Sequence, residues 1–203
     1  MNSDSANQAL TLLEEAGQAA LDAAGPEEAI HTLAKSCFDL LGDRLAHERP
    51  GALREGERQF FVAGAFIVTP DRQHHMLVGN LGFPAEQRRL MVPIDGGHPG
   101  HVYATQKKLI LKNTDVHGSF KQYLKSARMG SAILSPMIWK SQFIGQFIMA
   151  AQARNTFRDQ DLAVLVAVSR LATAAWVAHD GLAWIESHHA PEDAFYVARE
   201  GLR

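Results

Sequence analysis

The sequence predicts an α+β fold with one mainly antiparallel sheet of five to six strands. Crossover helices cover one face of the sheet, and N- and C-terminal helices cover the other. Three observations predict this fold: two helical patterns come first, strand patterns follow from Phe60, and a long apolar helix pattern runs to about Ser187. Helices on both faces of such a sheet bury the apolar side chains of both faces.

Two helices are predicted before residue 50. Residues 5–24 place small and aliphatic side chains at three- and four-residue steps, as an amphipathic helix does. Gly25 and Pro26 interrupt the pattern, and proline suits the first turn of a second helix at about 26–46. A polar stretch follows this pair. We therefore expect a helical pair at 1–50, a main domain at 51–187 and a tail at 188–203.

The strand patterns begin with "QFFVAGAFIVTP", in which both alternating faces are apolar. A strand of this kind lies inside a sheet whose two faces are both covered. Gly64 and Ala65 leave room for a close approach to this strand. The partner strand "HHMLVGNL" follows, then two short strands around the turn "GGHPGHVYATQK", and finally the hairpin "AILSPMIW" and "QFIGQFIMAAQ".

The last helix is expected to run unbroken from about Arg158 to Ser187, with two apolar stripes. One stripe faces the sheet, and the other has the heptad spacing of a helical bundle. The heptad positions are Val164, Val168, Leu171, Ala175, Ala178, Leu182 and Ile185. We expect a homodimer through the N- and C-terminal helices. The alternative is a monomer in which the N-terminal pair covers this stripe.

Composition narrows the functional class. The net charge of −2 provides no basic patch for a nucleic acid. The single cysteine, Cys37, allows no internal disulfide, so we expect a cytoplasmic protein in which this residue is a small buried apolar side chain. We expect neither a signal peptide nor a membrane anchor, because the N-terminus lacks a basic region and the last helix carries Arg170 and Asp180.

Common catalytic motifs are absent from the sequence, namely GxxxxGK[ST], HExxH, CxxC, GxSxG and GxGxxG. Their absence disfavours P-loop phosphoryl transfer, zinc-dependent hydrolysis and α/β-hydrolase chemistry. The ten histidines are irregularly spaced, and the adjacent pairs His74-His75 and His188-His189 form no ready bidentate site, so no metal site is predicted.

Candidate ligand-binding residues cluster between the strands. His98 and His101 flank the glycine turn with Tyr103 nearby, and they form either a ligand-binding rim or ordinary surface. Positive side chains in the crossover segments leave open a small anionic ligand, with Lys112 as a candidate. We interpret Lys121, Lys125 and Arg128 as a solvated helix stripe. An apolar pocket wall is expected from Phe66, Met91, Met129, Met137, Phe147 and Met149, although core packing also explains each of them.

Four pieces of sequence occur in the order of a known family. They are the first hairpin, "VPIDGGHPGHVYATQKKLILKN", "SAILSPMIWKSQFIGQFIMAA" and "NTFRDQDLAVLVAVSRLATAA". Together they resemble the GAF domain family of small-molecule sensory modules, from about Phe60 to Ala178. The chain departs from the family at Arg158, where a capping Thr, Ser or Asp is usual.

The resemblance also excludes some ligands and reactions. The NKFDE-type motif of cyclic-nucleotide-binding members is missing, and no cysteine after Phe60 can attach a bilin covalently. The free methionine sulfoxide reductase branch uses several cysteines, whereas this chain has one. The ligand therefore stays unidentified, as a small organic or anionic molecule.

The resemblance implies a stand-alone sensory domain that binds a small ligand and signals to a separate protein through its helices. The residues expected at the ligand are Phe66, Met91, His98, His101, Tyr103, Lys112, Asp115, Tyr123, Met129, Ser131 and Phe147. One alternative is an enzyme in which His101, Tyr103 and Asp115 act as acid–base groups. The other is a dimerisation or scaffold module without a ligand.

Overall fold

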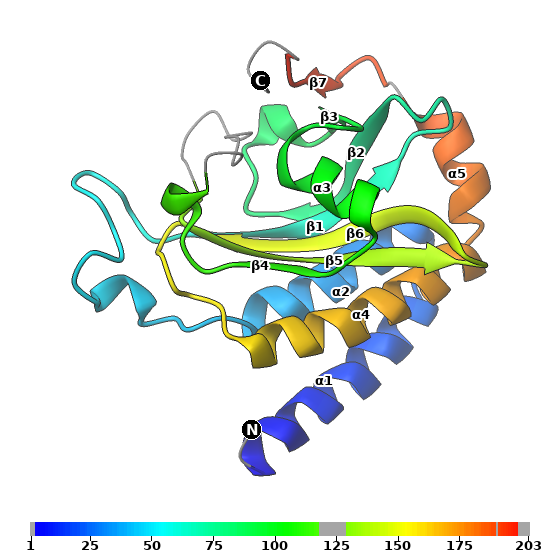
Figure 1. The fold of residues 1–203 in the computed structure, drawn as a ribbon. Coiled ribbons are helices and arrows are strands. Elements are labelled where there is room, and N and C mark those ends of the chain that lie inside the picture. The colour runs from blue at the N-terminus through cyan, green and yellow to red at the C-terminus, as the bar shows by residue number, and fades with distance from the viewer. Residues whose placement is uncertain (1–2, 118–128, 190, 199–203) are drawn as a thin grey trace.

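The computed structural model describes residues 3–117, 129–189 and 191–198, and within them the chain forms one seven-stranded sheet with a layer of helices on one face (Figure 1). The strand order is β4-β5-β6-β1-β2-β3-β7. The pairs are antiparallel except for β3 with β7, which is parallel. The predicted fold class is confirmed. The additional strand, β7, comes from the segment expected to be a tail.

The order of the elements follows the sequence patterns, but α2 ends earlier than expected and the last helix is divided in two. The helices are α1 (Ser3–Leu21), α2 (Pro26–Leu40), α3 (Gly97–Thr105), α4 (Asp159–Ala178) and α5 (Gly181–His188), with short 3-10 turns η1 (Ala46–Glu48), η2 (Ala85–Gln87) and η3 (Thr114–Val116). The strands are β1 (Phe61–Val68), β2 (His74–Leu81), β3 (Leu90–Pro93), β4 (Leu109–Leu111), β5 (Ser131–Trp139), β6 (Gln142–Ala151) and β7 (Phe195–Tyr196).

The central strand β1 is buried on both faces, as predicted. Phe61, Ala63, Ala65 and Ile67 belong to the core cluster shared with α1, α2 and α4, which we call the helix-side core. Val62 and Phe66 belong to clusters on the opposite face, which we call the crossover face because α3 lies over it. The space expected beside Gly64 is filled by the protein itself, since a Cβ there would lie 3.0 Å from the Leu77 side chain.

Helix α2 is part of the helix layer rather than a separate N-terminal unit. Its residues Ile30, Leu33 and Cys37 are fully buried in the helix-side core, and α2 packs against β1, β2 and α4. Cys37 is therefore the small buried side chain that the sequence indicates. Burial raises the pKa of its thiol to about 12.

The prediction of one unbroken helix to Ser187 is wrong. The helix stops at Ala178 because Asp180 adopts a left-handed backbone with φ of 54°, and α5 then starts at Gly181. A Cβ at Gly181 would lie 2.4 Å from the Trp176 ring, so the turn places bare backbone against that ring. The predicted heptad stripe is divided between two helices. Val168 and Ala175 of α4 and Ile185 of α5 lie in the helix-side core, whereas Leu182 is 43% exposed.

Helix α4 is long and apolar enough to cross a membrane by length and composition alone, with a mean hydropathy of 1.6. The structure instead packs it beneath β5 and beside α2, and Leu165, Ala172 and Trp176 are fully buried there. Its first turn is capped without the usual hydroxyl or carboxylate at residue 158. Asp161 accepts hydrogen bonds from the Arg158 and Gly42 backbone N–H groups at 2.7 and 3.1 Å.

A buried arginine joins the loop before β1 to the end of β6. The Arg154 side chain is only 2% exposed. Its Nε donates to Asp115 Oδ2 at 2.9 Å, and its Nη groups donate to the Glu57 carboxylate and to the Ala52 carbonyl. Arg54 also pairs with Asp115 at 2.8 Å. Opposite charges with several hydrogen bonds make this burial tolerable.

Replacing Arg154 by methionine should destabilise the fold by about 3 kcal/mol, because the partly buried Glu57 loses its ion pair and Asp115 keeps only Arg54. Urea unfolding followed by circular dichroism measures this loss. The control is Arg158→Met, which removes a guanidinium that is 67% exposed and lies 3.4 Å from Asp43. That change should shift stability by no more than about 0.5 kcal/mol. Equal effects of the two substitutions would contradict a special role for Arg154.

Candidate functional site

The crossover face carries the cluster of polar and aromatic side chains that best suits a small ligand. Helix α3 packs over β5 and β6, and its own residues His98 and Val102 are buried. The sequence "GGHPGHVYATQ" folds this way because its glycines and proline turn the chain directly after β3 and start a short helix at Gly97.

Four rings from four elements meet on this face. His75 of β2 has its ring centroid 5.8 Å from Tyr103 of α3, 6.4 Å from Phe143 of β6 and 6.5 Å from Phe66 of β1. Tyr103 and Phe143 lie 5.3 Å apart at an interplanar angle of 83°. These edge-to-face contacts form an aromatic group with His75 as its only strongly polar member.

Two fully buried side chains beside Phe66 each keep one polar atom that has no partner among the residues that the structure describes. His75 Nε2 lies 3.2 Å from the Ile94 carbonyl, and its Nδ1 is unpaired. Gln146 pairs across the strands with Phe66, and its Nε2 donates to the Pro99 carbonyl at 3.1 Å, while its Oε1 is unpaired. Buried polar atoms are almost always hydrogen-bonded to protein or water, so both atoms are available to a hydrogen-bonding partner.

The protonation of His75 determines which partner it can accept. Burial lowers the pKa of His75 to about 4, despite the hydrogen bond to the Ile94 carbonyl, so the ring is neutral at pH 7. A carbonyl can only accept, so Nε2 carries the proton and Nδ1 is an acceptor. Gln146 Oε1 is also an acceptor. The site therefore calls for hydrogen-bond donors.

A second histidine on this face is also held neutral. Burial lowers the pKa of His98 to about 4, and the neighbouring charges of His117 and His101 lower it further. The His98 and His117 rings lie 6.0 Å apart at an interplanar angle of 89°. Within the described part of the chain no group of three or more His, Cys, Asp or Glu side chains can hold a metal ion.

Four of the predicted site residues lie on the crossover face in buried or half-buried positions. They are Phe66, His98, Tyr103 and Met129. Met91 and Phe147, with Met137 and Met149, lie instead in the helix-side core. The expectation that these four methionine and phenylalanine side chains line the pocket fails, because neighbouring strand residues point to opposite faces.

The remaining predicted residues are dispersed. Ser131 donates its hydroxyl to the Ala153 carbonyl at 2.7 Å and shares the strand face of Ile133. His101 is exposed on α3, and Lys112 is exposed near Asp159 at 3.5 Å. Asp115 is held by Arg154 and Arg54. Tyr123, and with it Lys121, Lys125 and Arg128, lies outside the described residues.

Sequence reasoning missed His75, Phe143 and Gln146. The available signal for Gln146 was an amide inside the otherwise apolar run "FIGQFIM". For His75, the alternation of side chains along a strand correctly predicts that it points to the opposite face from His74. The contacts that bring it to α3 depend on distant segments, which no local pattern reports.

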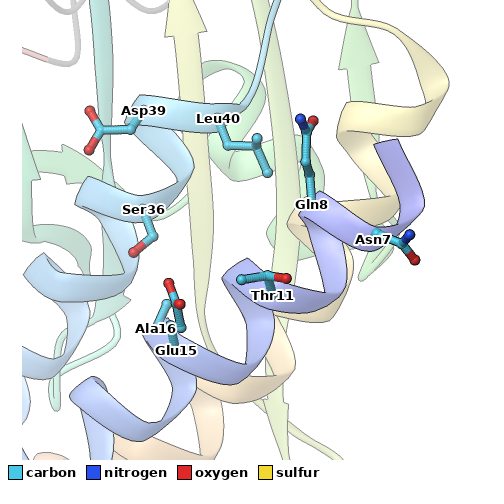
Figure 2. A pocket seen from close by; sticks show the side chains of 8 residues that line it. All are labelled: Asn7, Gln8, Thr11, Glu15, Ala16, Ser36, Asp39 and Leu40. Atoms are coloured by element: carbon cyan, nitrogen blue, oxygen red, sulfur yellow. The ribbon is translucent and has the colours of Figure 1, made fainter. Parts of the chain in front are cut away.

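Hollows also occur on the helix layer. Figure 2 shows one between α1 and α2, with a volume of about 550 Å³. It is lined by Asn7, Gln8, Thr11, Glu15, Ala16, Ser36, Asp39 and Leu40. Another hollow of about 180 Å³ lies where α1 meets the ends of α2 and α4. These open grooves lie on the opposite side of the sheet from His75 and Gln146.

The depressed pKa of His75 predicts a pH-dependent stability. Between pH 6.5 and about pH 4 the unfolded chain binds a proton at this residue and the folded chain does not, so the free energy of unfolding should fall as the pH is lowered through this window. His75→Phe should reduce that slope by up to about 1.4 kcal/mol per pH unit. Urea midpoints at several pH values measure this slope.

Leu77→Ala, a packing change nearby, should lower stability at every pH and leave the slope unchanged. A His75→Phe slope equal to that of the wild type would contradict the assignment.

The comparisons with known proteins agree with this architecture. The GAF domain model matches residues 25–176, which includes α2. No curated protein matches the chain. Similar solved structures include the GAF domain of an Acinetobacter phosphoenolpyruvate-protein phosphotransferase, with 13% identity and a TM-score of 0.67 over 90% of this chain and 98% of that one.

Two further structures show the same fold. Free methionine-R-sulfoxide reductase from Neisseria meningitidis, in complex with its substrate, has 15% identity and a TM-score of 0.68 over 90% of this chain and 95% of that one. A putative GAF sensor protein from Burkholderia vietnamiensis has 16% identity and a TM-score of 0.67 over 87% of this chain and 98% of that one. With the family model covering most of its length and the sheet, helix layer and crossover helix in place, the chain belongs to the GAF domain family.

Proposed function

We propose that this protein is a sensory domain that binds a small organic molecule on the crossover face, beneath α3. The observation that carries the proposal is a pair of buried acceptors beside the aromatic group, His75 Nδ1 and Gln146 Oε1, which have no partner in the described part of the chain. Leaving both unsatisfied costs the fold free energy, and a ligand that donates hydrogen bonds to them removes that cost.

The chemistry of the site favours a particular class of ligand. The two acceptors select N–H or O–H donors, and the rings of Phe66, Tyr103 and Phe143 suit a flat apolar part. A small anion fits less well, since neutral acceptors repel it and Lys112 lies at the surface beside Asp159. We therefore favour the organic ligand over the anionic one.

A binding role is better supported than an enzymatic one. Cys37 is buried in α2 on the helix side of the sheet, and its raised pKa keeps it a thiol, which opposes redox chemistry of the kind carried by the sulfoxide reductases. The alternative acid–base set is divided, because Asp115 is engaged by two arginines while His101 is exposed on α3.

The signal would pass through the strands to the helix layer. Gln146 faces the ligand side, and the next residue, Phe147, is fully buried in the helix-side core. A ligand that favours one arrangement of α3 and β6 thereby shifts the packing of α2 and α4, and a separate cytoplasmic protein would respond to that change.

We further propose that α1 mediates a homodimer. Leu10 and Leu21 are exposed by 64% and 52%, and eleven residues of helix place them on one stripe. The groove of Figure 2 runs beside this helix and offers the partly buried Leu40 to a second copy. Exposed leucines on one stripe are typical of a helical interface.

Native mass spectrometry of gently purified protein tests the ligand site. We expect a bound species in addition to the 22.3 kDa chain. His75→Phe and Gln146→Leu should weaken its binding about 10-fold or more, since each removes one acceptor. The matched controls His74→Phe and Gln142→Leu, which change the same residue types outside the site, should retain it. A chain that carries no small molecule, with ordered water on both acceptors in a crystal structure, would support the scaffold alternative instead.

Sedimentation equilibrium tests the dimer. The wild-type protein should sediment at twice 22.3 kDa, and Leu10→Glu should reduce it to one chain because a charge is buried in the interface. The control is Leu182→Glu, an exposed leucine of α5 that lies off the α1 stripe and is 43% exposed. Wild-type sedimentation as a single chain, or dissociation by the control alone, would remove α1 as the interface.

A further inference from the structure

The C-terminal segment connects the two faces of the sheet. Ile185 of α5 lies in the helix-side core, and Ala194 packs against that same core. The next residues, Phe195 and Val197, pack against the crossover-face cluster of Phe66, Leu77, Leu90 and Val92. The chain therefore passes around the outer edge of β3, where Figure 1 shows β7 beside β3.

This segment docks as a short parallel strand. Leu90 pairs with Phe195, and Met91 pairs with Tyr196. The Phe195 N–H donates to the Arg89 carbonyl at 3.0 Å, and the Val197 N–H donates to the Met91 carbonyl at 2.9 Å. Among the described strands this is the only parallel pair, and it completes the edge that β3 would otherwise expose.

The alternation of side chains matches the docking. Phe195 and Val197 face the apolar cluster, whereas Tyr196 between them is 50% exposed, with its ring 5.3 Å from that of His74. An extended segment that adds backbone hydrogen bonds to a sheet edge and buries alternate side chains is the usual arrangement of strand addition.

The pairing of β7 with β3 involves few residues compared with the pairing of the other strands. β7 has two residues and pairs on one side only, whereas β1 has eight residues and pairs with both β2 and β6. Edge elements with few contacts open locally, without unfolding of the core.

We propose that residues 191–198 form a detachable strap and that the outer edge of β3, with the cluster of Phe66, Leu77, Leu90 and Val92, is its docking site. The bound strap covers the β2–β3 end of the crossover face. Phe66 contacts both the strap's cluster and the His75 ring, so release of the strap uncovers the side of the aromatic group. The regulatory value of this release rests on the proposed ligand site, whereas the docking itself does not.

Hydrogen exchange of the full-length protein, followed residue by residue, tests whether the strap detaches. The Phe195 and Val197 amides should be protected relative to an unstructured peptide, because both donate to β3 carbonyls. They should still exchange at least about 100-fold faster than the amides of β1 and β6. Exchange at the rate of those central strands, or no protection at all, would overturn the proposal.

Two matched substitutions in the full-length chain test the docking site. Phe195→Asp should abolish the protection of the Val197 amide and increase the fluorescence of the apolar dye 1-anilinonaphthalene-8-sulfonate, because the Phe66 cluster becomes exposed. Tyr196→Asp adds the same charge to the outward face and should change neither signal. The proposal fails if the two variants behave alike, or if Phe195→Asp lowers the urea midpoint as much as Leu77→Ala does. None of these measurements uses a ligand. The strap proposal can therefore hold if no ligand binds beneath α3, and the ligand proposal can hold if the strap does not detach.

Discussion

The whole structure depends on the burial of both faces of β1 and β6. Along these two strands alternate side chains point to opposite sides, so each strand contributes to the helix-side core and to the crossover face at once. A shift of register by one residue would exchange the two sets. On β1, Phe61, Ala63 and Ala65 point toward the helices. This combination of one aromatic and two small side chains fixes the register of the strand.

This constraint explains what could be predicted and what could not. Composition and periodicity locate the strands and both N-terminal helices, since burial of a strand or a helix face leaves a local pattern. They do not tell which face of the sheet carries the proposed ligand site. Met91 and Phe147 are apolar and adjacent to crossover-face residues, but parity places them with the helices. Phe66 was placed correctly because it falls on the other parity of β1. Met129 precedes β5, so its place on the crossover face does not follow from strand alternation.

The other features that sequence patterns did not predict depend on interactions between distant segments. The break between α4 and α5 depends on the Trp176 ring, against which Gly181 packs. Asp115 looked like a candidate site residue, but Arg154, 39 positions later, engages it in a structural ion pair. β7 pairs with a strand about a hundred residues earlier in the chain. Neither hydropathy nor local propensity carries information about such pairs, so sequence patterns alone leave them open.

The two faces of the sheet are coupled by more than the alternation within single strands. At the end of the β5–β6 hairpin a register shift between Met137 and Ile138 turns Ile144 toward the helices and leaves Phe143 in the aromatic group. Phe143 therefore contacts α3 through the Tyr103 ring, while its neighbour Ile144 lies in the helix-side core. At the opposite edge the segment after α5 spans both faces around β3. Two series of contacts therefore join the aromatic group to the helices, one through β6 and one around β3, and both begin at side chains whose rings lie near His75.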